Sequence, residues 1–381
     1  MFTMDSLRRI FHFIFLIIFF ACQTNSDISK QSFLISASQK TKLHYAKHFE
    51  IFKSDSCYTV KVFNPWQFAK NKSYIYNFTI LKPTNFNAIS IPVHRIICLS
   101  TSHIGFVAAL NQQQAIVGVS GSQFINDSHI CELIKERKIA DVGYEQSLNY
   151  ELILSLKPDV IIAYGVESRN IGYITKLEEL GLPVIFVAEY LEETPLAKAE
   201  WLKFFGIIFN LEEKSDSIFS VINSEYNSIR QSAWQFPEKP TVFAGLPWKD
   251  SWYIAGGMSN LACLIKDAGA SYVWNNDTSK ESFPLNLEMV FNKAGNADFW
   301  INSGSANSLK EISSTDSRLT LFKAFQFKKI YNNNSKCNLS GGNDYWESGI
   351  VNPQIILKDI VKIFHPQAFP NYKIYYYKKL E

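Results

Sequence analysis

The sequence predicts an α/β protein of two Rossmann-like lobes with mainly parallel sheets, joined by one long helix. Three observations carry this prediction. Strands alternate with helices in two separate stretches, a long proline-free helical stretch lies between them, and one seven-residue pattern occurs in both halves. Alternating strands and helices are typical of parallel βαβ units, and 381 residues are enough for two domains that each bury a core.

The chain opens with a pattern typical of a signal peptide. Two arginines precede an apolar run over residues 10–20, and Ala21 and Cys22 follow. A membrane-spanning helix needs about 20 apolar residues, so this run is too short for a permanent span. A small residue before cysteine resembles the bacterial lipobox, although Phe19 stands where leucine is usual. We expect residues 1–21 to be a lipoprotein signal peptide and Cys22 to be the lipid anchor; the alternative is an ordinary secretory signal.

The next segments predict a tether and then the first lobe. Residues 22–44 are polar and without period, as expected of a flexible tether. Residues 57–62 and 74–80 are β-rich and flank the breaker Asn64-Pro65-Trp66, which predicts a leading β-hairpin. The N-terminal α/β lobe is expected over residues 45–194. Its expected strands cover residues 95–99, 116–119, 160–164 and 184–187, and its expected helices cover residues 104–110, 150–156 and 174–180.

A long helix is expected over residues 197–234, which contain no proline, one glycine and apolar residues at helical spacing. It lies within an interlobe helical region over residues 195–236. Twenty helical residues span about 30 Å, the width of a small domain. The C-terminal α/β lobe is expected over residues 237–381. Its expected elements cover residues 241–245, 260–268, 297–302 and 355–364.

Composition excludes some classes of protein. The net charge of +3 comes from scattered Lys and Arg, so the basic patch of a nucleic-acid binder is missing. Five cysteines follow Cys22 without a CxxC pair, which supports neither a zinc site nor a disulfide framework. We interpret them mainly as small buried side chains, and their disulfide state stays open. They are Cys57, Cys98, Cys131, Cys263 and Cys337.

The most specific signal is a repeat between the two halves. Residues 148–154 read LNYELIL and residues 285–291 read LNLEMVF, and each copy continues through Asp, an apolar strand and Gly. Asn149 and Asn286 suit helix N-caps, which places a glutamate in the first turn of each helix. Equivalent helices are therefore expected to begin alike in both lobes.

With these segments the sequence resembles the class III periplasmic binding proteins, which carry cobalamin, ferric siderophores or haem to ABC importers. The resemblance covers roughly residues 92–368, and the leading hairpin is similar to the Bacteroidetes lipoprotein form. It implies a non-enzymatic periplasmic monomer, lipid-anchored to a bacterial membrane, that serves a permease dimer. It also implies no intrinsic cofactor and no metal ligated directly by the protein. The segments that carry it are residues 95–100, 116–119, 155–159, 180–184 and 361–366.

The resemblance also implies how the protein docks. Family members present one surface glutamate per lobe to arginines of the permease, and Glu151 and Glu288 match these positions. Helix physics alone offers a plainer interpretation, because a first-turn carboxylate stabilises its helix by about 0.3–1 kcal/mol.

A ligand of this fold is expected between the lobes, at the C-terminal ends of the strands. Rigid aromatic side chains in those loops suit a bulky chelate. Tyr144 matches a position where cobalamin binders carry an aromatic residue, and residues 345–347 resemble the family's Asp-Trp-Phe-Glu stretch. A core position for the tryptophans and a structural role for His103 remain the alternatives. The expected ligand residues are Tyr144, Tyr164, His103, Trp248, Trp252, Tyr345, Trp346 and Glu347.

Two other functions stay open at this point. A secreted glycosidase-like hydrolase would need two carboxylates about 5–10 Å apart, which sequence does not show. GxSxG, HExxH and GxxxxGK[ST] motifs are absent from the sequence. Glu151 and Glu288 facing each other across a pocket would favour the hydrolase, and an outer position would favour the binding protein. The other function is a lipoprotein that scavenges ligand without a permease.

Overall fold

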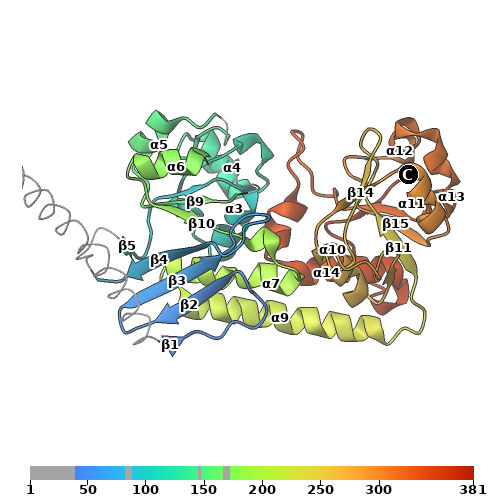
Figure 1. The fold of residues 1–381 in the computed structure, drawn as a ribbon, viewed down its shortest axis with the longest axis horizontal. Helices are drawn as coiled ribbons and strands as arrows, with labels where there is room; N and C mark the ends of the chain where they lie inside the picture. The colour runs from blue at the N-terminus through green and yellow to red at the C-terminus, as the bar shows by residue number, and fades with distance from the viewer. Residues whose placement is uncertain (1–38, 82–87, 145–146, 166–171) are drawn as a thin grey trace, which may run out of the picture.

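The computed structural model describes residues 39–81, 88–144, 147–165 and 172–381. Two α/β lobes stand side by side on a long helix, and a separate β-sheet precedes the first lobe (Figure 1). The predicted fold class is therefore confirmed. The predicted signal peptide, the anchor Cys22 and most of the tether lie outside the described residues. Within the described ranges, every helix is too short or too polar to cross a membrane.

The leading sheet has five strands in chain order. They are β1 Gln39–Lys40, β2 Phe49–Lys53, β3 Cys57–Phe63, β4 Ser73–Thr79 and β5 Ala88–Ser90. β3 and β4 form the predicted hairpin, with Val60 opposite Tyr76. Alternate residues of β3 are buried, so one face of the sheet packs on the molecule. On that face the ring centroids of Phe49 and Trp201 lie 4.4 Å apart. The hairpin is thus the centre of a larger sheet than the sequence predicts.

The structure shortens the tether predicted over residues 22–44. Gln39 pairs with Lys53 between β1 and β2. The backbone N–H groups of residues 44–46 donate to the buried carboxylate of Glu200 at 2.7–3.1 Å. Because these backbone groups find partners in the folded protein, the polar composition of this end does not leave it a free linker.

The first lobe contains a parallel sheet in the order β10-β9-β6-β7-β8. All residues of its four longer strands, β6, β7, β9 and β10, are buried, as expected for a parallel sheet covered on both faces. The strands are β6 Ile96–Cys98, β7 Ile116–Val119, β8 Ala140–Asp141, β9 Val160–Ala163 and β10 Val184–Phe186. The helices are α3 Thr101–Ala109, α4 Ser128–Lys135, α5 Tyr150–Leu156 and α6 Gly172–Glu179, with 3-10 turns η1 Gln113–Ala115, η2 Ser122–Phe124 and η4 Glu189–Leu191.

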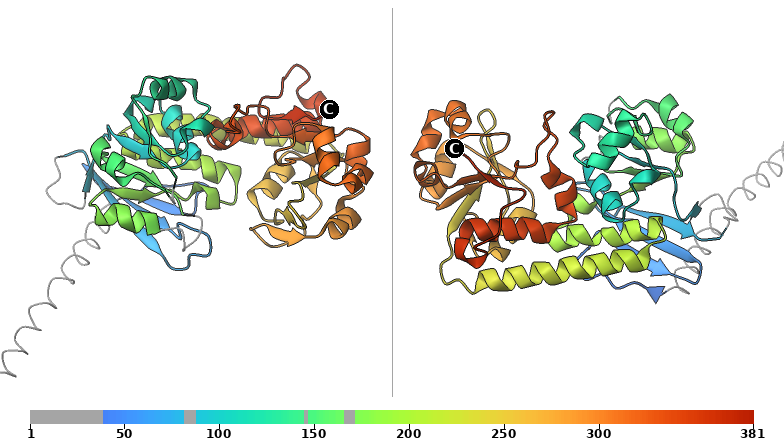
Figure 2. Two further views of the ribbon diagram at one scale, coloured as in Figure 1. Left: turned by 90° about the horizontal axis from the view of Figure 1, so that it is seen from above. Right: turned by 180° about the vertical axis from the view of Figure 1, so that it is seen from behind.

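The interlobe region contains the predicted long helix, but it is shorter than expected. The stretch 197–234 is divided among α7 Pro195–Glu200, α8 Leu202–Ile208 and α9 Glu212–Trp234. The chain turns before α9 at Asn210, whose φ of 54° lies in the left-handed region that asparagine tolerates. α9 has 23 residues, which corresponds to about 34 Å. It runs beneath both lobes beside α14 (Figure 2).

The second lobe repeats the architecture of the first. Its sheet has the order β13-β11-β15-β16-β17, parallel except for β17. The strands are β11 Thr241–Ala244, β13 Ser271–Tyr272, β15 Phe299–Ile301, β16 Ile330–Asn332 and β17 Lys378–Lys379, with β12 Trp252–Ile254 and β14 Phe283–Leu285 paired separately. The helices are α10 Asn260–Asp267, α11 Leu287–Ala294, α12 Leu309–Thr315, α13 Lys323–Gln326 and α14 Pro353–Phe364, with 3-10 turns η5 Ser317–Leu321, η6 Asp344–Trp346, η7 Ser348–Ile350 and η8 Pro366–Ala368.

The sequence repeat corresponds to two equivalent helix starts. The Asn149 side chain accepts from Leu152 N–H at 3.0 Å at the start of α5. Asn286 accepts from Met289 N–H at 2.9 Å at the start of α11. Both asparagines are therefore N-caps, as predicted.

The cysteines differ in part from the prediction. The five in the described part of the chain are free thiols, but only Cys98 is fully buried and Cys337 is exposed. Cys337 is exposed because it lies on a loop that lines the cavity between the lobes. The five cysteines are therefore not all core residues.

Candidate ligand-binding cleft

A cavity of about 850 Å³ lies between the lobes, within the range typical of ligand pockets. The segments that follow β6, β7 and β9 line it from the first lobe, and the segments that follow β15 and β16 line it from the second. The C-terminal ends of both parallel sheets therefore face one cavity, as expected for α/β proteins.

A loop of residues 333–347, which we term the cleft loop, connects β16 to η7 and rises between the lobes (Figures 1 and 2). The Asn338 side-chain amide donates to the carbonyls of Gln123 and Ile125 in the first lobe, at 2.9 and 3.1 Å. Gly342 approaches the Phe124 carbonyl so closely that an added Cβ would lie 2.1 Å from its oxygen. The cleft loop thus belongs to the second lobe but is fastened to the first.

Aromatic side chains line the cavity from both sides. Phe124, Tyr144 and Tyr164 come from the first lobe, and Trp346 comes from the cleft loop. Tyr144 is 45% exposed and its hydroxyl accepts from the Gln123 side-chain amide. These rings offer π and apolar surface in a loop environment, which is the arrangement that rigid planar or bulky ligands need.

Tyr164 lies above His103, with ring centroids 6.2 Å apart in an edge-on arrangement. Tyr164 lines the cavity, but His103 is fully buried in α3 beneath it. Burial lowers the pKa of His103 to about 3, against the opposing effect of the Ile162 backbone. A neutral imidazole inside the first lobe does not reach the cavity, so the structure does not support His103 as a ligand residue.

The two tryptophans expected from the segment after β11 are not in the cavity. Trp252 is fully buried, and its indole N–H donates to the Ala244 carbonyl at 3.1 Å. Its ring packs among Phe243, Trp300 and Phe322, which makes it a core residue. Trp248 is 64% exposed under the Lys249 ammonium, outside the residues that line the described cavities. Both expectations are corrected, because β12 places the Trp252 ring in the core and Trp248, which precedes β12, is exposed away from these cavities.

The triplet 345–347 splits into three roles. Tyr345 is buried in edge-on contact with Tyr376 and Tyr377. Trp346 is 56% exposed and lines the cavity. Glu347 is 2% exposed, and its carboxylate accepts from Asn126 and Asp127 backbone N–H at 2.8 and 2.7 Å. Glu347 therefore links the lobes, in place of the ligand-binding role expected for it.

Burial dominates the electrostatics of Glu347. It raises the pKa of the carboxyl to about 7, although the backbone N–H groups of Asn126 and Asp127 act in the opposite direction. The backbone carbonyl of Glu347 also faces Gly105 of α3, where an added Cβ would lie 2.2 Å from its oxygen. The lobes touch closely at this point, and a larger residue at position 105 would separate them.

A model of the periplasmic binding protein family matches residues 96–336, which is more than half of the chain. The chain belongs to the periplasmic binding protein family. The class III resemblance is thereby confirmed, and with it the coarse function of a solute-binding protein of the ABC transporter type.

Relatives and solved structures agree with this assignment. An uncharacterized lipoprotein of Methanocaldococcus jannaschii is 27% identical over 303 residues, which are 77% of this chain and 70% of the relative. A possible iron-binding, periplasmic solute-binding protein from Staphylococcus epidermidis has a TM-score of 0.57 at 18% identity, covering 72% of this chain and 99% of that one. The periplasmic heme-binding protein RhuT from Roseiflexus sp. RS-1 has a TM-score of 0.55 at 20% identity, with coverage of 72% and 99%. The two structures show that this periplasmic binding protein shares their fold, and the family indicates an extracytoplasmic location.

Glu151 and Glu288 of this periplasmic binding protein lie in the first turns of α5 and α11. Both are exposed, and neither lines a described cavity. They occupy equivalent outer positions, so they do not form the carboxylate pair that a glycosidase would need.

Sequence reasoning missed Phe124, Asn338 and Leu339, which all line the cavity. Phe124 follows β7 just as Tyr144 follows β8, so the rule that selected Tyr144 would have found it. Leu339 and Asn338 carry no such signal, because their positions depend on how the cleft loop packs on the other lobe. In the described part of the chain, His, Cys, Asp and Glu side chains form no group of three that could hold a metal ion.

Proposed function

We propose that this chain binds a bulky metal chelate between its lobes and delivers it to the permease of an ABC importer. The chelate is a ferric siderophore, haem or cobalamin. The protein contributes no cofactor of its own, because the metal arrives already held by its chelator. It acts as a monomer anchored through Cys22 to a bacterial membrane, on the periplasmic side.

The cavity of about 850 Å³ carries this proposal. Its volume suits a ligand larger than an amino acid or a simple sugar, and its exposed rings suit an extended apolar or conjugated surface. Two proteins of the same fold are named for iron binding and heme binding, which favours an iron chelate among the candidates.

The cargo is tested with the purified mature protein. Haemin, cyanocobalamin, a ferric catecholate siderophore and a ferric hydroxamate siderophore are each mixed with the protein, and the absorption spectrum is recorded after desalting. We expect one chelate to be retained at a 1:1 ratio and to displace the others in competition. Retention of none of the four would contradict the proposed class of cargo.

Delivery to a permease is tested through Glu151 and Glu288. Reversing both to Lys places positive charge where permease arginines are expected, so capture of the cognate permease in detergent should be lost while chelate affinity stays unchanged. Glu132→Lys and Glu238→Lys reverse two other exposed carboxylates and serve as the matched control, which should still bind the permease. Chelate binding without capture of any permease by the unaltered protein would favour the scavenger instead.

A further inference from the structure

A second cavity, of about 620 Å³, lies on the other side of Trp346, whose side chain lines both spaces. Residues 64–70 of the leading sheet, between β3 and β4, form one wall. η4 and α7 form the next wall, and the second lobe closes the third side through the start of α10 and residues 280–282. We term this space the second compartment.

The wall from the leading sheet lies outside the region that the family model matches, because residues 64–70 precede residues 96–336. Trp66 holds the wall in place. It is buried, and its ring centroid lies 5.7 Å from that of Phe186 at the end of β10 and 6.1 Å from that of Tyr74. Phe68, at the tip, is 75% exposed and lines the compartment. The leading sheet thus extends the cleft beyond the part matched by the family model.

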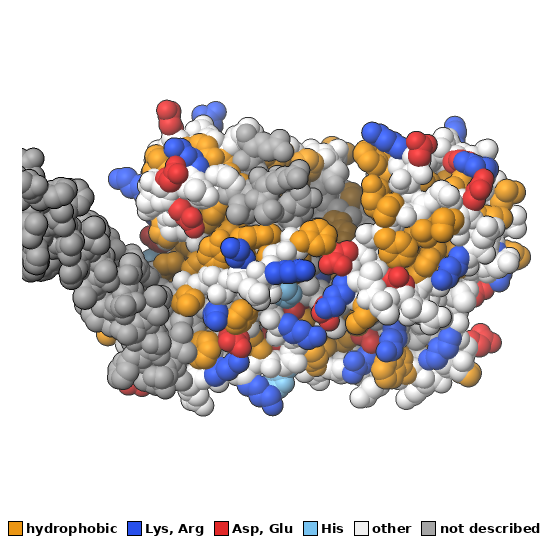
Figure 3. Space-filling view, viewed as in Figure 1, with side chains coloured by type: hydrophobic (Ala, Val, Ile, Leu, Met, Phe, Trp, Pro, Cys, Tyr) orange, Lys and Arg blue, Asp and Glu red, His pale blue; other side chains and the backbone are white. Residues whose placement is uncertain are grey.

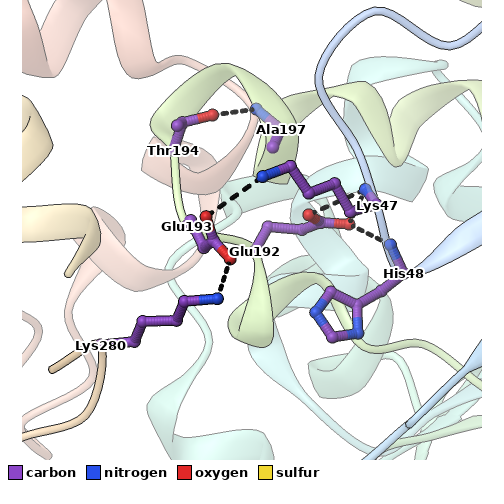
Figure 4. A network of polar contacts seen from close by, with 7 residues as sticks. All are labelled: Lys47, His48, Glu192, Glu193, Thr194, Ala197 and Lys280. Atoms are coloured by element: carbon purple, nitrogen blue, oxygen red, sulfur yellow. Dashed lines mark hydrogen bonds and ion pairs between the residues drawn. The ribbon is translucent and has the colours of Figure 1, made fainter. Parts of the chain in front are cut away.

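Of the three glutamates that line the second compartment, Glu192 and Glu193 already have partners (Figure 4), whereas Glu281 is exposed to solvent. Glu192 accepts from the backbone N–H groups of Lys47 and His48 and from the Trp201 indole, all at 3.0–3.1 Å. Glu193 forms ion pairs with Lys47 at 3.2 Å and with Lys280 at 2.5 Å. Acidic and basic side chains gather on this face of the molecule, around the middle of the view (Figure 3). Glu192 is therefore held by N–H donors and Glu193 by two ammonium groups, and Glu281 is the one lining carboxylate without an ion pair or hydrogen bond among the described residues.

Two donors in the second compartment are not used inside the described structure. The Lys198 ammonium of α7 makes no hydrogen bond and no ion pair within 4 Å with the described residues. Burial lowers the pKa of Lys198, and the more distant Glu189 and Glu192 act in the opposite direction. The Asn260 side-chain N–H₂ group is buried without a hydrogen-bond partner among those residues. Asn260 is also the first residue of α10, where backbone N–H groups and the helix dipole favour negative charge.

We propose that the second compartment binds a carboxylate arm of the cargo, held between Lys198 and Asn260, with Trp346 separating the arm from the body of the chelate. A cation, an unused amide donor and a helix N-terminus converge there, which is the chemistry that recognises an anion. Lys198 and Asn260 offer one ammonium and one amide donor, which fits a monoanionic carboxylate. Lys70 and Glu281, which also line the compartment without ion pairs among the described residues, carry opposite charges. This inference rests on the proposed function, because it takes the carboxylate to be part of the chelate. The anion site itself is testable without any chelate.

The test uses benzoate, an aromatic monocarboxylate, and benzamide, its neutral counterpart. Each is titrated into the mature protein while the Trp346 indole and the Asn260 side-chain amide are followed by NMR. We expect saturable millimolar binding of benzoate and at least tenfold weaker binding of benzamide. Equal affinity for the two probes would overturn the proposal.

Variants separate the site from general effects of charge. Lys198→Met should reduce benzoate affinity to the benzamide level, and Lys198→Arg should retain it. Asn260→Asp keeps a residue that favours a helix N-terminus and should repel benzoate, which provides a second test where Lys198→Met does not fold. Lys249→Met, which removes a charge outside the compartment, should change nothing. Unchanged benzoate binding in Lys198→Met would overturn the proposal. The chelate-binding assays test the first cavity, so their result does not depend on this outcome.

Discussion

Trp346 and Trp248 are exposed to a similar extent, at 56% and 64%, but only Trp346 lines the cleft cavity. Trp252, four residues after Trp248, is a core residue. Residue type therefore identifies a candidate, while the packing of its neighbours decides whether the ring faces ligand, solvent or core. The two exposed tryptophans form a natural pair for experiment.

Trp346→Ala should weaken binding of the retained chelate by about 2 kcal/mol, or roughly 30-fold, because a large ring at the centre of a cleft carries much of the contact energy. Trp248→Ala removes an equally large exposed ring away from the cavity and should leave the affinity within a factor of about two. Titration of absorbance or intrinsic fluorescence measures both. Equal losses in the two variants would show that Trp346 has no special part in binding.

Glu347 is the second informative residue, because its carboxylate joins the cleft loop to the start of α4. Its pKa is raised from 4.5 to about 7 by burial, and Asp344 and Asp127 act in the same direction. Cys131, whose pKa is also raised, lies close enough to sense it. An acid with a raised pKa in the folded state holds its proton there at a pH where the unfolded chain has lost it.

The contribution of Glu347 to stability should therefore be largest below pH 4.5 and should be lost as the pH rises through about 7. The full change is on the order of 3 kcal/mol. Urea unfolding of the unaltered protein and of Glu347→Gln is measured at several pH values between 4.5 and 8. The difference between the two free energies of unfolding gives the contribution of Glu347. We expect the difference between their free energies of unfolding to fall with rising pH. A difference independent of pH would show that burial does not control this carboxyl.

Among the elements, α7 and the end of η4 fasten the leading sheet to the body of the molecule. Glu200 accepts from three consecutive backbone N–H groups, of residues 44–46, and Glu192 accepts from the next two. Both carboxylates are buried, so their removal would take the partners from several part-buried backbone donors. The wall of the second compartment that residues 64–70 form belongs to this leading sheet and depends on the same attachment.

Glu200→Ala should lower the free energy of unfolding by about 3 kcal/mol. Three part-buried donors lose their partner, and an unpaired donor costs up to about 1–3 kcal/mol when fully buried. The segment 39–48 should also become the first site of proteolytic cleavage. Glu213→Ala, which removes an exposed carboxylate in the first turn of α9, should cost less than about 0.5 kcal/mol. Denaturant titration and limited trypsin digestion measure the two effects. Protection of residues 39–48 in Glu200→Ala would contradict this account.

The prediction of elements succeeded where burial alone controls the pattern. Strands β6, β7 and β9 are continuous apolar runs because both faces are covered, and such runs are visible in the sequence. The sequence pattern does not show that residues 197–234 divide among three helices. It depends on the turn at Asn210 and on the contact of Gly206 with Ser215, where an added Cβ would lie 2.1 Å from the serine hydroxyl oxygen.

For the whole molecule, the connections between the lobes limit movement. α9 runs beneath both lobes as one continuous helix (Figure 2). Asn338 and Glu347 add hydrogen bonds across the cleft, and Lys280 of the second lobe pairs with Glu193. A ligand therefore enters a cleft that is largely formed in advance, which reduces the cost of binding.

Binding of the retained chelate should change the radius of gyration by about 1 Å or less, as in preorganised complexes. Small-angle X-ray scattering of the free and loaded protein measures this quantity. Glu347→Ala combined with Asn338→Ala removes the interlobe hydrogen bonds and should enlarge the change. A large contraction of the unaltered protein would show that the continuous helix and these contacts do not hold the lobes.

The sequence by itself determined the α/β class, the two lobes, the long connecting helix and the paired N-caps at Asn149 and Asn286. Each of these depends on local propensity or on a pattern of burial that repeats along the chain. The tertiary structure alone decided which rings face the cleft, that His103 and Trp252 are buried, and that Glu347 joins the lobes. It also decided that the leading sheet forms a wall of the second compartment. These features arise from contacts between residues far apart in the sequence, and a local pattern carries no record of which distant surface a side chain will meet.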